Sequence, residues 1–369
     1  MNALPATVRH LFPGGNTAYG FHSFFDYIAG PEIRRIFVVK GGPGVGKSTL
    51  MRRVADEASA QGYAVEWHHC SSDNDSLDGV VIPGLATALI DGTAPHVVDP
   101  KHPGGIDTIV HLGDFWDEAA MREEREAIVD ATREVGRLFR RAYAFLAAAK
   151  LMRDQRKTAC LDSGAMDFAA LNRTAEAVSR ELFTDRPSLA RTGRERHLFA
   201  SAITPDGLRH HLESIFTPVK HRVVLVGLPG TGKATFVRRL ADLAVFRGYD
   251  VEVFHDGLDP TRVEHVLIPA LDAAVITGAE PHVYVPGPQD RLLNTEEFLN
   301  RPRLTTFTSE LETAIAFYDA AFAHAIDSLH RAKEVHDELE RHYVPHMDFA
   351  AIGRRGDELM EKVFAASLS

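Results

Sequence analysis

Four glycines, a lysine and two hydroxyl side chains stand together in the pattern G-x-x-x-x-G-K-[ST]. In such a loop the glycines let successive backbone N–H groups turn inward and bind phosphate oxygens, and the next helix adds the positive end of its dipole. The pattern predicts a Walker A loop, in which Lys47 contacts the β- and γ-phosphates of ATP and the Ser48 hydroxyl is a ligand of Mg²⁺. The residues expected to bind the nucleotide are Gly41, Gly42, Pro43, Gly44, Val45, Gly46, Lys47, Ser48 and Thr49.

Two aspartates are candidates for the remaining chemistry. A P-loop site needs a second Mg²⁺ anchor, usually an acid at the end of an apolar strand, and Asp91 ends the apolar run 87–91. We predict that Asp91 is a metal ligand and a catalytic residue; the alternative is that Asp91 and Gly92 only form a turn. Asp73, in the polar stretch 70–78, is a candidate to orient a water or to accept a proton from a substrate hydroxyl. The alternative for Asp73 is an ordinary surface loop.

The chain consists of two similar halves. Residues 227–235 repeat the first loop at an offset of 186 residues, and the correspondence runs without a gap to about residue 100. Because such long self-similarity marks a repeated structural unit, we predict two P-loop domains in tandem, residues 1–190 and 191–369. The matching segments include Gly62-Tyr63 with Gly248-Tyr249, Pro95-His96-Val97 with Pro281-His282-Val283, and 166–170 with 347–351. His96 and His282 are candidates for either a structural role or a phosphate contact.

The second loop lacks both predicted metal anchors. Ala234 stands where the first half has Ser48, and Thr277 stands where it has Asp91, whereas Lys233 keeps the lysine. We therefore expect the first loop to be the Mg²⁺-dependent site. We expect the second loop to bind nucleotide weakly, to bind another anion or to be a structural partner. Its expected contacts are Gly230, Thr231, Gly232, Lys233, Ala234 and Thr235.

The elements that position these loops follow from the apolar patterns. Apolar runs predict strands near 35–40, 63–69 and 87–91 and a short one near 96–99, and a helix follows each loop. Since the strands are almost continuously apolar, we predict a parallel sheet in each half, covered on both faces as a three-layer α/β/α unit. The segments 9–20 and 196–207 either serve their own domains or are exchanged between them.

A long helix is expected after each sheet. Residues 114–156 contain no proline and one glycine, and apolar residues recur there at spacings of three and four, as they do again from 311 to 332. These seams predict either packing of the two helices within the chain or a coiled coil that forms a homodimer. Arginines of the first helix, Arg137, Arg140 and Arg141, are either a lid over the phosphates or a solvated face.

Composition limits the classes of partner. The net charge of −10 argues against a nucleic-acid partner, because phosphate backbones attract basic surfaces. The two cysteines, Cys70 and Cys160, are too few for a disulfide framework. Since no apolar run reaches the length that spans a bilayer and no leader pattern begins the chain, we expect a cytoplasmic protein without a membrane partner.

Four segments together resemble a family of bacterial tandem P-loop NTPases, which are described as ATPase-like or nucleotide-kinase-like and have no assigned substrate. The segments are Gly-Phe-His-Ser-Phe-Phe-Asp-Tyr at 20–27, the loop at 41–49, His-Cys-Ser-Ser-Asp at 69–73 and Asp-Gly-Thr-Ala-Pro-His-Val-Val-Asp-Pro at 91–100. The resemblance covers nearly the full length and implies nucleotide binding.

Three functions agree with these patterns. The first is Mg²⁺-dependent ATP hydrolysis at the N-terminal site, with a regulatory or structural C-terminal half and movement of the helical segments. The second is a small-molecule or nucleotide kinase in which Asp73 activates the acceptor, and the third is a non-catalytic nucleotide-sensing scaffold. An unknown small molecule or protein is then the further partner, and the choice between ATP and GTP stays open.

Overall fold

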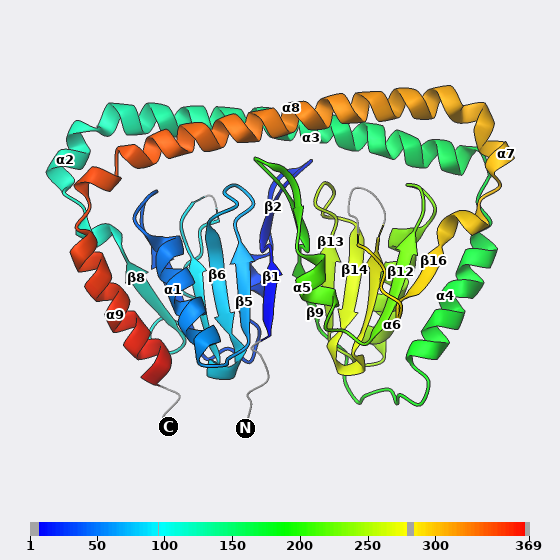
Figure 1. The fold of residues 1–369 in the computed structure, drawn as a ribbon, viewed down its shortest axis with the longest axis horizontal. Coiled ribbons are helices and arrows are strands. Elements are labelled where there is room, and N and C mark those ends of the chain that lie inside the picture. The colour runs from blue at the N-terminus through cyan, green and yellow to red at the C-terminus, as the bar shows by residue number, and fades with distance from the viewer. Residues whose placement is uncertain (1–6, 95, 279–283, 366–369) are drawn as a thin grey trace.

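Two six-stranded sheets stand side by side beneath a pair of long helices (Figure 1). The computed structural model describes residues 7–94, 96–278 and 284–365. The N-terminal sheet has the strand order β1 (Val8–Leu11), β5 (Val65–His69), β6 (Leu77–Ile82), β7 (Thr87–Asp91), β4 (Arg35–Lys40) and β8 (Asp107–His111). The C-terminal sheet repeats this order with β9 (Glu195–Leu198), β13 (Val251–His255), β14 (Val263–Ile268), β15 (Ala273–Thr277), β12 (His221–Val226) and β16 (Arg291–Asn294).

Both sheets are mixed, so the prediction of purely parallel sheets is wrong. β6 runs antiparallel to β5 and β7, and β14 does the same in the other half. The connections around β6, residues 70–76 and 83–86, are shorter than the dozen or more residues that a parallel crossover needs. The strand expected near 96–99 is also wrong, because residues 96–99 form no strand and β8 takes the edge beside β4.

A 14-residue helix covers one face of each sheet. α1 (Lys47–Ala60) follows β4, and α6 (Lys233–Phe246) follows β12. The opposite faces carry only short elements, η1 (Phe25–Tyr27) on the N-terminal sheet and α5 (Leu212–Phe216) on the C-terminal sheet. The expected α/β/α layering is therefore complete on one face only.

The closing helix of each half packs on the sheet of the other half. α4 (Phe168–Leu182) buries Leu171 and Val178 among residues of the C-terminal core, and α9 (Phe349–Ala365) buries Leu359 and Val363 in the N-terminal core. Isolated β-bridges fix the start of both exchanged helices: Met166, before α4, pairs with Leu299, and Met347, before α9, pairs with Trp116. A boundary near residue 190 divides the two sheets but separates each sheet from one of its covering helices.

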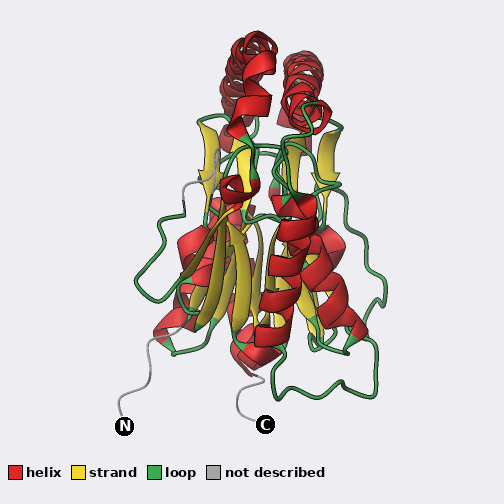
Figure 2. Cartoon of the chain, turned by 90° about the vertical axis from the view of Figure 1, so that its right-hand side faces the viewer, coloured by secondary structure: helices red, strands yellow, loops and turns green. Residues whose placement is uncertain are grey.

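The long helices α3 (Arg125–Asp162) and α8 (Thr308–Arg341) connect the two halves of the molecule. At 38 residues and a rise of about 1.5 Å per residue, α3 extends for roughly 57 Å, enough to pass over both sheets. α3 and α8 lie beside each other above the sheets (Figure 2), and Leu146 and Leu329 are buried between them. The seams thus pack within the chain, and Arg137 is exposed and bonded to Glu134, as on a solvated face.

The remaining elements connect these parts. The hairpin of β2 (Gly14–Thr17) and β3 (Gly20–Ser23) and the hairpin of β10 (Ser201–Thr204) and β11 (Gly207–His210) lie between the sheets and the long helices. β1 pairs with β5 and β9 pairs with β13, so these N-terminal strands stay in their own halves. The other helices are η2 (Pro83–Leu85), η3 (Gly113–Phe115), α2 (Glu118–Glu123), η4 (Pro269–Leu271), η5 (Thr295–Phe298), α7 (Arg301–Leu304), η6 (Thr305–Phe307) and η7 (Val344–His346).

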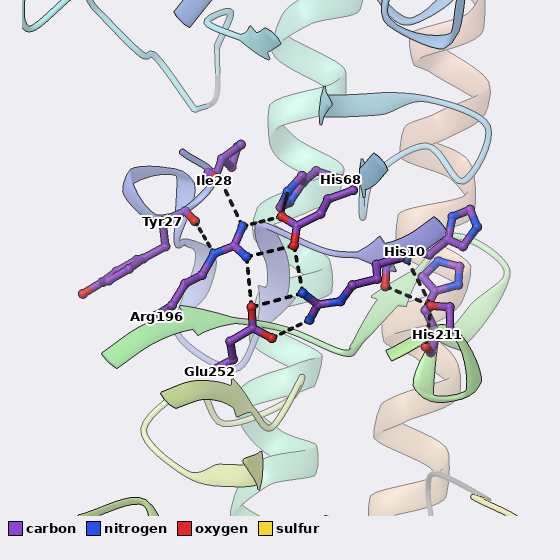
Figure 3. Close-up of polar contacts among 10 residues, drawn as sticks. His10, Tyr27, Ile28, His68, Arg196, His211 and Glu252 are labelled. Carbon is purple, nitrogen blue, oxygen red and sulfur yellow. Dashed lines mark hydrogen bonds and ion pairs between the residues drawn. The ribbon is translucent and has the colours of Figure 1, made fainter. Parts of the chain in front are cut away.

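Four charged side chains, two buried glutamates and two partly buried arginines, join the two sheets where β1 and β9 meet (Figure 3). Arg9 donates to Glu66 at 2.8 Å and also to Glu252, while Arg196 donates to Glu66 at 2.7 Å and to Glu252 at 3.1 Å. Burial alone would raise the pKa of the Glu66 carboxyl, but Arg196 and Arg9 hold it well below its usual range. The quartet is therefore fully ionised at neutral pH.

None of the described helices is both long enough and apolar enough to cross a membrane.

Candidate functional site

The loop at residues 41–49, here called loop 1, has the backbone shape that binds anions. Gly44 and Gly46 have φ of 67° and 85°, values that favour glycine, and α1 begins directly afterwards at Lys47. The Lys47 ammonium folds back and donates to the carbonyls of Gly41 at 3.1 Å and Gly42 at 2.8 Å. An ammonium and a helix N-terminus thus meet at one point, an arrangement that favours a phosphate group.

Asp91 lies beside this lysine. Because β7 runs parallel to β4 and next to it, the carboxyl end of β7 brings Asp91 Oδ2 to 3.7 Å from Lys47 Nζ. The other oxygen, Oδ1, accepts a hydrogen bond from the Thr93 N–H at 2.8 Å, so the turn also exists. Asp91 therefore caps the turn with one oxygen and faces loop 1 with the other.

A second carboxylate, Asp78, accompanies Asp91 and was not among the predicted site residues. The ladder between β6 and β7 pairs Gly79 with Ile90, so Asp78 lies opposite Asp91 at the next position. The stretch 70–78 looks like one polar loop in the sequence, whereas β6 begins within it at Leu77. The apolar run Val80-Val81-Ile82 was the signal that a strand starts here.

The surroundings of the Asp78 carboxyl favour its protonated form. Burial raises its pKa to about 8, and the nearby charge of Asp91 adds to the shift. Its Oδ2 atom is buried without a hydrogen-bond partner among the described residues. A divalent cation held between Asp78 and Asp91 would offset the cost of burying two neighbouring carboxylates and would give Asp78 Oδ2 a partner.

These oxygen groups fit Mg²⁺. The Ser48 hydroxyl accepts a hydrogen bond from the Leu77 N–H at 3.0 Å, which places it next to the start of β6 and hence next to Asp78. The described parts of the chain contain no group of three or more His, Cys, Asp or Glu side chains that could hold a metal ion. Mg²⁺ at a nucleotide site does not need such a cage, because phosphates and waters complete its ligands. Ser48, Asp91 and Asp78 would hold it here.

We expect Mg²⁺-dependent nucleotide binding to be pH-dependent through Asp78. Since the carboxyl must lose its proton to face the cation, the affinity for Mg·ATP should rise up to about tenfold per pH unit between pH 6 and 8 and level off above that. Titration calorimetry across this range would measure the rise, and Asp78→Asn should flatten it. Asp75→Asn, at an exposed position in the same loop, should leave the slope unchanged. An unaltered slope in Asp78→Asn would contradict the assignment.

The folded protein without ligand provides an independent check of the same pKa. A carboxyl whose folded-state pKa is raised stabilises the fold below its ordinary pKa and loses that contribution as the pH rises towards about 8. Asp78→Asn should therefore be more stable than the parent at pH 8 and close to it at pH 4. Thermal unfolding at both pH values measures the difference.

Asp73 and His96 are placed differently from Asp91. Asp73 accepts hydrogen bonds from the Ser76 hydroxyl at 2.7 Å and from the Asp75 N–H at 3.3 Å, and Lys333 of α8 lies 3.7 Å away. His96 stacks on Phe25, its Nε2 is 3.7 Å from Asp78, and burial lowers its pKa to about 4. His96 is thus a neutral, buried neighbour of Asp78, whereas His282 lies outside the described residues.

The C-terminal end of α8 covers loop 1. The Gly44 N–H donates to Glu340 Oε1 at 3.1 Å, so a carboxylate takes one of the backbone groups that would bind phosphate. A Cβ atom at Gly42 would lie 2.9 Å from the Tyr343 ring, and one at Gly44 would lie 3.0 Å from Val344. No local pattern in the sequence signals these contacts, because the helix arrives from the other half.

The loop at residues 227–235, here called loop 2, has left-handed glycines at 230 and 232, which match Gly44 and Gly46, but its surroundings differ. Lys233 Nζ donates to the carbonyls of Gly227 at 2.5 Å and Leu228 at 2.9 Å, as Lys47 does in loop 1. The Thr277 hydroxyl, at the position of Asp91, donates instead to the backbone carbonyl of Glu264 at 2.8 Å. Together with Ala234, this leaves loop 2 without counterparts of Ser48 and Asp91, whereas Glu264 stands at the position of Asp78.

Comparison of the chain with protein-family models, with curated proteins and with solved structures found no match.

Proposed function

We propose that the chain is a Mg²⁺-dependent ATPase that hydrolyses ATP at loop 1, with the C-terminal half in a regulatory role. The observation that carries the proposal is the meeting of the Lys47 ammonium with the paired carboxylates of Asp91 and Asp78 at the mouth of loop 1. The resemblance to tandem P-loop NTPases points the same way. The Walker A pattern alone would support binding; the carboxylate pair adds the metal anchor that phosphoryl transfer needs.

The residues of loop 1 have separable roles in this mechanism. The backbone N–H groups and Lys47 bind the β- and γ-phosphates and hold the phosphoryl group in line for attack by water. Ser48, Asp91 and Asp78 would hold Mg²⁺, which would supply positive charge to offset that of the phosphate oxygens. Most of the catalysis proposed here is therefore positioning and electrostatic stabilisation, as is usual for phosphoryl transfer.

Nucleotide binding also involves α8. Glu340 and a phosphate group compete for the same Gly44 N–H, and their like charges repel each other, so nucleotide entry displaces the Glu340 side chain. Because α8 packs along α3, we expect a displacement at this end of α8 to shift α3, the helix that covers loop 2. This contact supports an ATPase that couples loop 1 to the helical segments.

Steady ADP release by the purified full chain tests the proposal. With Mg²⁺ and ATP alone we expect continuous turnover, and with EDTA none. ADP release that requires an added acceptor would instead indicate a kinase, and binding without turnover would indicate a nucleotide-sensing scaffold. Either result would overturn hydrolysis as the activity.

We expect Glu340→Gln to bind Mg·ATP about tenfold more tightly than the parent. The substitution keeps the size of the side chain but removes the charge that holds the Gly44 N–H and repels the phosphates; hydrogen bonds to charged groups contribute roughly 1.5–3 kcal/mol, so a tenfold change is the lower end. Titration calorimetry measures it. Glu338→Gln, at an exposed position on the same helix, is the matched control and should bind like the parent. Weaker binding by Glu340→Gln would show that Glu340 assists the nucleotide.

A further inference from the structure

A cavity of about 900 Å³ opens at loop 2, built by both halves of the chain. Its volume lies within the roughly 300–1,000 Å³ of ordinary small-molecule sites. The C-terminal half contributes Gly230 and Lys233 of loop 2, while the N-terminal half contributes Lys157 of α3, Tyr19 and Phe168. The cavity therefore exists only because α3 and α4 pack on the other half.

Positive charge predominates in the lining. Its basic residues are Lys150, Lys157, Lys233, Arg238, Arg239 and Arg262, and its acidic residues are Asp154, Asp242 and Asp259. The three acids already have basic partners, since Lys150 bonds Asp154 and lies 3.6 Å from Asp259, and Arg238 bonds Asp242.

Several bases of the lining, Lys157 and Arg262 among them, stand outside these ion pairs, although the charge of Arg262 also lowers the pKa of Asp256. Across the described residues, no carboxylate forms an ion pair with Lys157 or Arg262. Burial, and then the charge of Arg262, lower the pKa of Lys233 to about 8, whereas the charges of Glu264 and Glu296 act in the opposite direction. An anion that fills the cavity would relieve the repulsion between Lys233 and Arg262.

The two loops differ by a reversal of charge at one helix position. On α3, Lys150 pairs with Asp154, and Lys157 follows three residues later; on α8, Lys333 pairs with Asp337, and Glu340 follows three residues later. Both helices lie against the loop at this point, because Cβ atoms added at Gly44 and Gly230 would meet Glu340 and Lys157 respectively. Loop 1 is therefore covered by an acid and has Ser48 and Asp91, whereas loop 2 is covered by a base and has Ala234 and Thr277 at those two positions, with Glu264 at the position of Asp78.

We propose that the cavity at loop 2 binds the di- or triphosphate group of a nucleotide without a metal ion. Lys233 and the loop 2 backbone N–H groups bind the phosphates, and Lys157 and Arg262 supply the positive charge that Mg²⁺ supplies at a metal-dependent site. Tyr19 and Phe168 are substantially exposed at the cavity and offer aromatic faces to a base. Inorganic tripolyphosphate shares the phosphate chemistry and lacks the nucleoside, that is, the ribose and the base.

Binding without metal, measured on the full-length Lys47→Ala protein in EDTA, tests the proposal. Titration calorimetry with ATP, tripolyphosphate and adenosine should show binding of the two phosphate compounds and little binding of adenosine. Tighter binding of ATP than of tripolyphosphate identifies a nucleotide site, and equal binding identifies a site for the phosphate group alone. Because the assay contains neither Mg²⁺ nor turnover, its outcome is independent of ATP hydrolysis at loop 1.

Charge-reversal variants in the same background sharpen the test. Lys157→Glu, which copies the charge found at loop 1, should weaken ATP binding by about 10- to 100-fold, and Arg262→Gln by about tenfold. Arg133→Glu makes the same charge change on the exposed far part of α3, outside the cavity lining, and should bind like its parent. Loss of binding in EDTA, undiminished binding by Lys157→Glu, or binding of adenosine equal to that of ATP would each overturn the proposal.

Discussion

Lys47→Ala should lower Mg²⁺-dependent ATP turnover by about 10²–10³-fold, the loss typical of removing one preorganised group that stabilises developing charge. The ammonium lies 3.7 Å from Asp91 and is held by two loop carbonyls, at the mouth of the loop where the proposed function places the phosphates. Alanine removes the charge without disturbing the glycines that shape the loop. Steady-state ADP release measures the change, and circular dichroism checks that the variant is folded.

Comparison with other lysines identifies the loop responsible. Lys101→Ala removes an exposed lysine that pairs with Asp26 away from loop 1, and we expect turnover like that of the parent. Turnover that survives Lys47→Ala but disappears in Lys233→Ala would reverse the assignment and make loop 2 the catalytic loop.

Arg196→Met should lower the free energy of unfolding by about 3–5 kcal/mol, the usual cost of leaving a buried charge without its partner. Arg196 bonds both glutamates of the central quartet and also donates to the backbone carbonyls of Tyr27 and Ile28. Without it, Glu66 and Glu252 repel each other with only Arg9 between them. Urea denaturation measures the loss of stability. We expect this loss to be accompanied by weaker docking of the two sheets.

Two further variants distinguish the ion pairs of the central quartet from ordinary surface ion pairs. Arg194→Met breaks an exposed pair with Asp250 and should change the unfolding free energy by less than about 1 kcal/mol. Adding Glu66→Leu to Arg196→Met should recover part of the loss, because the unpaired buried charge is then gone. An Arg196→Met protein as stable as the parent would show that the quartet contributes no net stability.

The same quartet makes stability sensitive to acid. Since the folded-state pKa of Glu66 is depressed, its contribution is present above the ordinary glutamate pKa of about 4.5 and is lost as the pH falls through the lower folded value. The parent should therefore lose stability in acid more steeply than Arg196→Met does.

Local sequence determined the parts of this protein that depend on neighbouring residues. The Walker A pattern places Lys47 at the first turn of a helix because glycines at 44 and 46 adopt conformations that other residues avoid. The loss of Ser48 and Asp91 from the second copy is readable by alignment alone. The long helices were predictable because their apolar spacing of three and four extends over many turns.

Tertiary structure decided which residues stand over each loop. Glu340 and Gly44 are 296 residues apart, and only the exchange of α9 and α4 between the halves brings α8 to loop 1 and α3 to loop 2. Asp78 joined the site through strand pairing, since its place opposite Asp91 depends on a register between two antiparallel strands. Sequence patterns report local periodicity, whereas these contacts depend on where a 38-residue helix ends in space. The residues that form loop 1 and the helix after it could therefore be predicted from the sequence, whereas the contrast between an acid over loop 1 and a base over loop 2 depends on the fold.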